Sequence, residues 1–212
     1  MRSRHPNLYD NEKLYYEKYH WLAGVDEAGR GPLAGPLVVA AVILSPSAPI
    51  EGVYDSKQLN AQDRESLYEQ IVRQCLCYAV VEISPAEIDA INILQATLKG
   101  MKEAIESLAQ RPDYILIDGN QVPEGYRLKA LPVIKGDCVY ASIAAASIVA
   151  KVTRDRIMDK YHAEYPQYGF LRNKGYGTPE HLKALDTYGP CPIHRMSFTP
   201  VQQASIWQFD KP

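Results

Sequence analysis

The sequence predicts a mixed α/β fold in which helices cover a β-sheet. Short apolar runs of strand length alternate with longer segments whose apolar residues recur at helical spacing. Residues 141–150 are apolar or small all round, which is typical of a buried helix. With 212 residues, 46% hydrophobic and 23% charged, the chain has the composition of a globular protein that can bury a core without disulfides or structural metal.

Five segments have the apolar pattern of β-strands. They are residues 21–25, 37–44, 76–83, 114–117 and 130–134. Because residues 37–44 are apolar on both faces, we expect them to form an interior strand. Pro132 cannot donate a hydrogen bond to a neighbouring strand, so we expect residues 130–134 at an edge of the sheet.

Three further segments are expected to be helical. Residues 60–74 have helical spacing, and Asn60 is a suitable N-cap. Residues 91–108 carry apolar side chains at alternating steps of three and four, which places them on one face of a helix. Thr178 followed by Pro179 is the pattern of an N-cap and a first helical residue.

Along the chain we expect a polar N-terminal segment over residues 1–19, a core over 20–165 and a helical extension over 166–212. The longest apolar run is far shorter than the roughly 20 residues of a membrane helix, and the first twenty residues lack the apolar stretch of a signal peptide. The four cysteines form no CxxC pair, which favours a reducing compartment. We therefore expect a cytoplasmic protein without a membrane partner.

Charge is unevenly distributed, although the formal net charge is only -2. Residues 151–212 hold 9 Lys and Arg against 6 Asp and Glu, and tyrosines are interleaved with these basic residues. Such a mixture suits phosphate contact and base stacking. A solvated helical face with half-buried tyrosines is an equally simple interpretation.

Acidic residues stand where three predicted strands or loops pass into turns or helices. Asp26 and Glu27 follow the first strand, Asp118 follows the fourth, and Asp137 precedes the buried helix. In open α/β sheets, sites assemble at such positions. Asp118 could instead form an Asx turn, and Asp137 could cap the helix. Because strand residues alternate between faces, the first strand must end or bulge at Asp26 if both of its acids serve one site.

A cluster of these four acids would need cations. Two carboxylates about 4 Å apart repel by roughly 4 kcal/mol at an effective dielectric of 20. Oxygen ligands of this kind suit Mg²⁺ or Mn²⁺ rather than zinc. Such cations can activate water and stabilise the leaving oxygen when a phosphodiester is hydrolysed.

Seven motifs occur in the order found in one family of nucleases. They occupy residues 25–36, 55–59, 117–120, 135–137, 144–151, 173–178 and 194–198. The first reads Val-Asp-Glu-Ala-Gly-Arg-Gly-Pro-Leu-Ala-Gly-Pro. Over about residues 20–200, the chain resembles the bacterial ribonuclease HII family. The ribonuclease HIII type carries an added N-terminal domain, whereas 25 residues precede Asp26 here, so we expect the HII type.

The resemblance implies a ribonuclease H-like fold and a metal-dependent endonuclease. Such an enzyme cuts the RNA strand of RNA/DNA hybrids and nicks DNA 5′ of an embedded ribonucleotide, leaving 3′-hydroxyl and 5′-phosphate ends, as in ribonucleotide excision and primer removal. Matched by motif, the catalytic and metal-binding positions are Asp26, Glu27, Asp118 and Asp137. The expected cofactor is Mn²⁺ or Mg²⁺. The helical extension is expected to help bind the duplex.

The same resemblance assigns residues to the substrate. Gly29, Arg30 and Gly31 match a loop that senses the ribose 2′-hydroxyl, the group that distinguishes RNA from DNA. Tyr176 matches a tyrosine that packs on the following sugar. Tyr176 could instead be a core tyrosine, and the glycines could serve only a tight turn.

Further assignments concern three lysines, a histidine and the C-terminal tail. Three lysines could contact phosphates, although lone lysines are more often simply solvated: Lys57, Lys151 and Lys174. His194 is expected to be structural. The tail over residues 203–209 partly resembles a sliding-clamp-binding box, with Asp210 where a second aromatic belongs, so a weak clamp contact is a hypothesis. We expect a monomer.

Two alternative functions remain at this point. One is another ribonuclease H-like, structure-specific nuclease, such as a resolvase. The other is a non-catalytic module that binds hybrids, in which the acids merely cap helices and form turns.

Overall fold

The computed structural model describes residues 7–53 and 59–209, with side chains described as far as Ala204. The chain divides into two compact units. The first, the sheet unit, comprises the chain up to Ala28 together with Val38–Val81 and Leu98–Val152. The second, the helical unit, comprises Gly29–Leu37, Glu82–Thr97 and the chain from Thr153 onward. The expected boundaries at residues 19/20 and 165/166 stay predictions.

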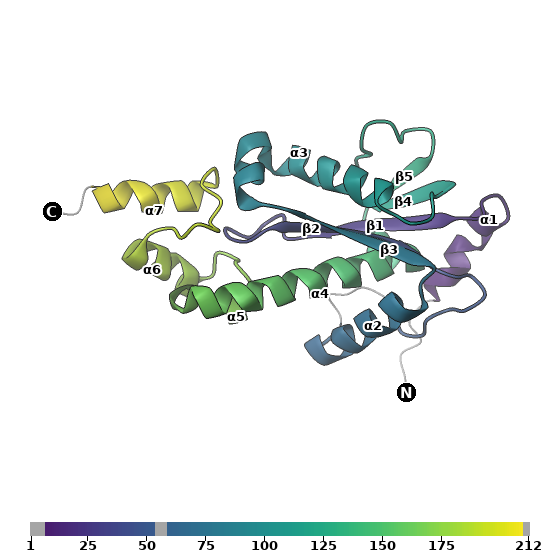
Figure 1. Cartoon of the computed structure of the whole chain (residues 1–212), viewed down its shortest axis with the longest axis horizontal. Coiled ribbons are helices and arrows are strands. Elements are labelled where there is room, and N and C mark those ends of the chain that lie inside the picture. Colours follow the sequence, from purple (N-terminus) through teal and green to yellow (C-terminus); the bar gives the residue numbers. More distant parts are fainter. Residues whose placement is uncertain (1–6, 54–58, 210–212) are drawn as a thin grey trace. The chain divides into compact units, whose positions relative to one another are not determined.

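A five-stranded mixed sheet forms the centre of the sheet unit (Figure 1). Its strands are β1 (Leu22–Ala28), β2 (Leu37–Ile43), β3 (Cys77–Ile83), β4 (Tyr114–Asp118) and β5 (Ala130–Val133). They lie in the order β3-β2-β1-β4-β5, with β1 antiparallel to β2 and parallel to β4. The predicted mixed sheet is confirmed, as are the interior position of β2 and the edge position of the strand that contains Pro132.

Strand β1 is longer than predicted. It remains paired with β2 as far as Ala28, which lies opposite Val38, whereas its pairing with β4 runs only to Val25. The strand therefore neither ends nor bulges at Asp26, which the sequence made the condition for both acids to serve one site. Glu27 nevertheless lies close enough to raise the pKa of Asp26. The acids lie inside a regular strand, beyond the last residue that is paired on both sides.

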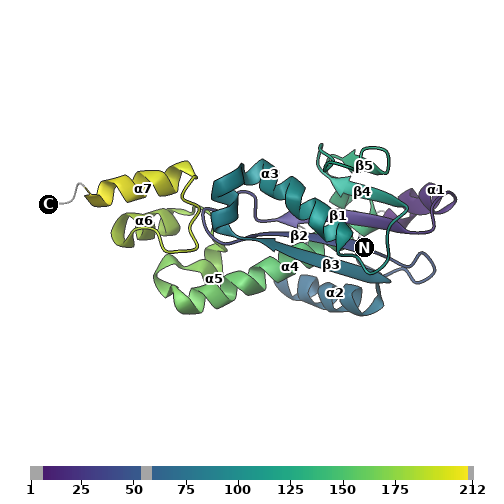
Figure 2. The same ribbon diagram turned by 45° about the horizontal axis from the view of Figure 1, so that its top comes forward.

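Helices cover both faces of the sheet (Figures 1 and 2). They are α2 (Ala61–Gln74), α3 (Pro85–Glu106) and α4 (Ala141–Glu164). The turns of α3 from Leu98 onward lie on one side, and α2 with the first half of α4 lies on the other. Asn60 caps α2 as predicted, its side chain accepting the Asp63 N–H at 2.9 Å.

Helix α3 begins earlier than the apolar pattern predicts. Its amino end lies at Pro85, where the Ser84 hydroxyl accepts the Glu87 N–H at 3.2 Å. The helix is interrupted at Asn92, whose φ is 66° and whose side chain accepts the N–H groups of Leu94 and Gln95. With a ψ of 161°, Asn92 lies outside the left-handed helical region, in a conformation nearly confined to glycine, and the two hydrogen bonds to its side chain offset part of this cost.

The amino-terminal half of α4 packs unusually close to the sheet at Gly24 of β1. A Cβ placed on Gly24 would lie 2.0 Å from the main-chain carbon of Ser142 and 2.3 Å from the nitrogen of Ile143. Residues 141–150 are all buried, which confirms the predicted buried helix, and the helix then continues to Glu164. Small side chains on α4 and the missing side chain at Gly24 together permit this approach.

Two short helices lie in the expected N-terminal polar segment, η1 (Leu8–Glu12) and α1 (Lys13–Tyr16). Glu12 is fully buried, and its carboxylate accepts both the N–H and the hydroxyl of Ser142 at 2.7 Å. It therefore caps the amino end of α4, where the helix leaves N–H groups unpaired. Burial raises the pKa of Glu12.

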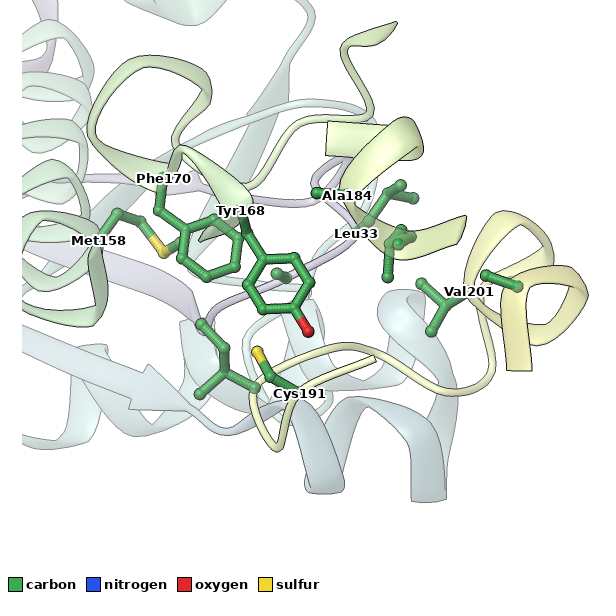
Figure 3. Close-up of a cluster of buried hydrophobic side chains, with 11 residues drawn as sticks. Leu33, Met158, Tyr168, Phe170, Ala184, Cys191 and Val201 are labelled. Carbon is green, nitrogen blue, oxygen red and sulfur yellow. The ribbon is translucent and has the colours of Figure 1, made fainter. Parts of the chain in front are cut away.

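The helical unit has a core of its own. Its short helices are η3 (Pro166–Tyr168), α5 (Phe170–Asn173), α6 (Pro179–Tyr188) and α7 (Thr199–Phe209). Figure 3 shows the rings of Tyr168 and Phe170 side by side, with Met158 and Cys191 on their flanks. As predicted, Thr178 caps α6, accepting the N–H of His181. None of the helices in the part of the chain that the structure describes is long and apolar enough to cross a membrane.

Candidate active site

The structure brings Asp26 of β1 to the surface of α4. Side chains alternate along a strand, so Asp26 points to the same face as Gly24, the face on which α4 packs. Asp26 is only 4% exposed, and its carboxylate accepts hydrogen bonds from the Ser147 side chain and, at 2.7 Å, from the N–H of Glu27. The close approach at Gly24 thus sets the distance at which Ser147 meets the acid.

Three carboxyl groups interact at this point. Burial raises the pKa of Asp26 well above its usual range, and the carboxylates of Glu27 and Asp118 raise it further. Asp118 ends β4, the parallel neighbour of β1, so the two acids lie at adjacent carboxyl ends of the sheet. A buried carboxyl beside two others is unfavourable without a compensating cation.

Asp137 is brought to the same end of the sheet by the segment that follows β5. The Gly136 N–H donates to Oδ1 of Asp118 at 2.7 Å, which joins η2 (Gly136–Cys138) to the end of β4. A Cβ on Gly136 would lie 2.5 Å from Cδ1 of Ile143, so a larger residue there would require the Ile143 side chain to move. Asp137 itself is 1% exposed.

The donor chemistry of these acids fits a hard divalent cation. All of the groups are carboxylates, which Mg²⁺ and Mn²⁺ prefer, and a cation would relieve the repulsion that raises the pKa of Asp26. Within residues 7–53 and 59–204, no three His, Cys, Asp or Glu side chains are arranged as a finished metal site. The acids therefore lie at one end of the sheet, but among the described residues they are not yet positioned to coordinate one ion together.

The predicted substrate-sensing residues lie together in the helical unit. Gly29 has a φ of +100°, and Arg30 and Gly31 are exposed. A Cβ on Gly31 would lie 3.6 Å from the ring of Tyr176, which is 46% exposed. Tyr176 is thus a surface side chain beside the loop, and the alternative of a core tyrosine does not hold.

The three lysines differ in their surroundings. Lys151 is half-buried on α4, one helical turn beyond Ser147 and on the same face. Lys174 forms an ion pair with Asp159, which competes with any phosphate contact. Lys57 lies outside the described residues, and so does Asp210 of the clamp-like tail, whose side chains are not described beyond Ala204.

His194 is buried in the helical unit, in a relay of hydrogen bonds. The Cys191 N–H donates to its Nδ1 at 2.9 Å, so the proton of the neutral ring is on Nε2. That Nε2 donates to Nε2 of His181 at 2.9 Å, and Nδ1 of His181 donates to the Tyr176 carbonyl at 2.9 Å. Both rings must therefore be neutral for the relay to hold.

We expect acid to destabilise the protein through this relay. Burial lowers the pKa of His194 to about 4, and the neighbouring His181 lowers it further. Burial also lowers the pKa of His181. An unfolded histidine titrates near pH 6.5, so between pH 6.5 and 4 the unfolded chain binds more protons and stability falls as the pH falls. The His194 contribution between pH 7 and pH 5 should be about 2 kcal/mol.

Urea unfolding at the two pH values measures this loss. The variant His194→Gln should lose less stability between pH 7 and pH 5 than the wild type, and the exposed His20→Gln should behave as the wild type. Equal losses in wild type and His194→Gln would contradict the assignment.

Three residues in the helices and loops were not assigned roles by the sequence. Ser147 and Arg195 fall within the motifs at residues 144–151 and 194–198, but nothing in those motifs indicates which atoms they contact. Arg154 lies in a charged stretch of the sequence, which is typical of a solvent-exposed helix surface, yet its side chain is only 1% exposed. Its spacing of seven residues from Ser147 is the only signal that it shares a buried face.

Comparison with known proteins identifies relatives that match most of the chain. The family model described as ribonuclease HII matches residues 23–201. A "Ribonuclease HII" of Xanthomonas campestris is 56% identical over 184 residues, which cover 86% of this chain and 77% of the relative.

Three solved structures are similar to this chain in fold. The ribonuclease H2 from Pyrococcus horikoshii has a TM-score of 0.78 and 31% identity, over 90% of this chain and all of that one. The ribonuclease HII in a complex with PCNA from Archaeoglobus fulgidus has a TM-score of 0.70 and 32% identity, over 84% and 95%. A Bst-RNase HIII in complex with Mn²⁺, with a TM-score of 0.73 and 19% identity over 90% and 71%, shares the fold.

Proposed function

The chain belongs to the ribonuclease HII family and is an RNA/DNA hybrid endonuclease, and we propose that Asp26, Glu27, Asp118 and Asp137 are its catalytic acids. The observation that carries this assignment is the Asp26 carboxyl, whose charged form is destabilised by burial, by the neighbouring Glu27 of β1 and by Asp118 at the end of β4. An arrangement that costs stability in the protein alone is expected where a cation completes the site.

The four acids would hold Mg²⁺ or Mn²⁺ through their oxygens. When bound, the cations polarise the scissile phosphate, favour ionisation of the attacking water and stabilise the leaving oxygen. The protein fixes the acids in advance: Ser147 and the Glu27 N–H hold Asp26, and the Gly136 N–H holds Asp118. Orientation of this kind lowers the barrier because less motion is frozen during the reaction.

Recognition of the ribonucleotide belongs, in this proposal, to Gly29, Arg30, Gly31 and Tyr176. The loop follows β1 directly in the chain, and Gly31 lies against the Tyr176 ring. Glycines allow the main chain to approach a ribose closely, and an exposed ring can pack on the next sugar. Lys151 is the lysine best placed for a phosphate, since it shares a helix face with Ser147. The expected product is a nick 5′ of the ribonucleotide, made by a monomer.

The Archaeoglobus relative was solved with PCNA, so a sliding clamp is a partner worth testing for this chain too. The sequence support is limited to the tail over residues 203–209, and absence of co-purification with the clamp at low salt would remove the hypothesis.

Cleavage of end-labelled duplexes tests the proposal. The substrate contains one ribonucleotide, and its controls are the same duplex made of DNA alone and a branched DNA. Preference for the ribonucleotide duplex is expected. Preference for the branched DNA would favour a resolvase-like activity, and binding without cleavage of any substrate would favour a non-catalytic module.

A further inference from the structure

Two buried arginines support the main chain of residues 29–36 in the helical unit. Arg195 donates from Nη2 to the Gly29 carbonyl at 2.6 Å, from Nη1 to the Arg30 carbonyl at 3.0 Å, and from both Nε and Nη2 to the Gly35 carbonyl at 3.1 and 3.0 Å. A single guanidinium group therefore fixes both ends of the Gly29–Gly35 loop.

Arg154 holds the far end of the same loop. Its Nη2 donates to the Ala34 carbonyl and its Nε to the Pro36 carbonyl, both at 3.0 Å. Its Nη1 donates to the Lys174 carbonyl at 2.9 Å. Lys174 lies two residues before Tyr176, so one side chain ties the loop to the segment that carries the tyrosine.

Other contacts bring these two segments together. The Leu33 N–H donates to the Gly175 carbonyl at 2.8 Å, and a Cβ on Gly175 would lie 2.4 Å from the Ala34 carbonyl oxygen. The loop is also joined to residues 193–195 by main-chain hydrogen bonds. The Gly35 N–H donates to the Ile193 carbonyl and the Arg195 N–H donates to the Leu33 carbonyl, both at 2.9 Å. The loop is thus held on several sides, and the arginines satisfy carbonyls that would otherwise face inward without a donor.

Burying two cations here is costly. Arg195 is 0% exposed and Arg154 is 1% exposed, and burial lowers their pKa values to about 9 and about 10. Both remain charged at neutral pH. Apolar side chains of similar volume would often stabilise a core equally well, so a costly pair of this kind suggests a gain in the conformation that it fixes.

We infer that Arg154 and Arg195 are positioning residues for ribonucleotide recognition. Arg195 fixes the main chain of Gly29 and Arg30, directly before Gly31. Arg154 sets the place of the loop relative to the Tyr176 segment. The inference rests on the proposed function, in which this loop and Tyr176 contact the ribonucleotide. Neither arginine needs to touch the substrate.

The variant Arg195→Lys separates geometry from charge. Lysine keeps the positive charge but has one compact ammonium group, which cannot replace a planar fork that serves three carbonyls. The matched control is Arg64→Lys, because Arg64 also donates to a main-chain carbonyl, that of Leu59, but lies on α2. Circular dichroism and melting temperature establish that each variant is folded.

Binding is measured with Ca²⁺ in place of Mg²⁺, on a duplex with one ribonucleotide and on the all-DNA duplex of the same sequence. For the wild type and Arg64→Lys we expect tighter binding of the ribonucleotide duplex. For Arg195→Lys the ratio of the two Kd values should fall at least about fivefold, with the Kd for DNA unchanged. With Mg²⁺, kcat should fall by roughly tenfold to a hundredfold, since small displacements of positioning groups have effects of this size.

The outcomes separate the two proposals. If the wild type binds both duplexes equally, the recognition role of the loop fails. If the wild type discriminates and folded Arg195→Lys does so equally well, the positioning role fails. Should Arg195→Lys not fold, hydrogen exchange of the wild type decides: slow exchange of the Leu33 and Gly35 amides is expected, and exchange as fast as in a free loop overturns the inference.

Discussion

Replacing Asp26 by asparagine should abolish most turnover and, at the same time, make the protein more stable. The substitution keeps the shape of the side chain and removes the charge that would hold a cation. Loss of one strong electrostatic contribution to the transition state commonly costs a hundredfold to a thousandfold in kcat, or roughly 3–4 kcal/mol. Affinity for a hybrid should change little, because the phosphates are held by other groups.

The gain in stability follows from the pKa of Asp26. Its pKa is raised in the folded protein by burial, Glu27 and Asp118, so the folded chain binds more protons than the unfolded chain above the ordinary aspartate pKa, and stability falls as the pH rises through that window. Asp26→Asn removes this loss. In metal-free buffer at pH 7.5 its melting temperature should exceed that of the wild type, by about 2–4 °C for each kcal/mol.

Asp10→Asn is a suitable control, since Asp10 lies in the same unit but forms an exposed ion pair with Lys13. It should retain full activity with little change in melting temperature. An active Asp26→Asn would show that Asp26 is not a catalytic acid, and a less stable one would show that its charge is compensated within the protein.

The variant Gly24→Ala should be strongly destabilised. The added Cβ would meet main-chain atoms of Ser142 and Ile143 at 2.0–2.3 Å, and main chain cannot rotate away as a flexible side chain can. Helix α4 must shift from β1, and overpacking of this kind costs typically 1–3 kcal/mol or more. The melting temperature should fall by at least about 6 °C, given roughly 2–4 °C per kcal/mol for a chain of this size.

Activity should fall as well, because the shift carries Ser147 away from Asp26. Gly125→Ala is the matched control: Gly125 has a φ of +91°, and no other atom lies within 4 Å of a Cβ built there. It should show only the backbone cost of alanine in that conformation, about 1 kcal/mol. Thermal unfolding that is unchanged in Gly24→Ala would mean that α4 does not lie as close to β1 as the structure has it.

The sequence predicts the fold well where short-range patterns decide it. Residues 37–43 form an interior strand because both faces are apolar, and the strand with Pro132 lies at the edge because proline cannot donate there. The length of β1 could not be predicted, since it depends on pairing with Val38 of another strand rather than on its own residues. The condition that β1 end or bulge at Asp26 came from the alternation of side chains along a strand, yet Glu27 raises the pKa of Asp26 although the strand is regular there.

Long-range contacts account for what the sequence does not reveal. Glu12 caps a helix 130 residues away, and Arg154 bonds carbonyls 118 and 120 residues away. Both side chains are ionisable, and nothing nearby in the chain indicates that they are buried. The acids were found because they follow strands and match family motifs, but their mutual repulsion emerges only when β1 and β4 lie side by side.

The position of the cut in a duplex that contains a single ribonucleotide decides whether the protein recognises and cleaves at ribonucleotides as proposed. With Mg²⁺ or Mn²⁺ we predict one nick on the 5′ side of the ribonucleotide, leaving 3′-hydroxyl and 5′-phosphate ends. Chelation should abolish the nick, and the all-DNA duplex should remain intact. Cleavage of both duplexes at equal rates, or of neither, would exclude the proposed activity.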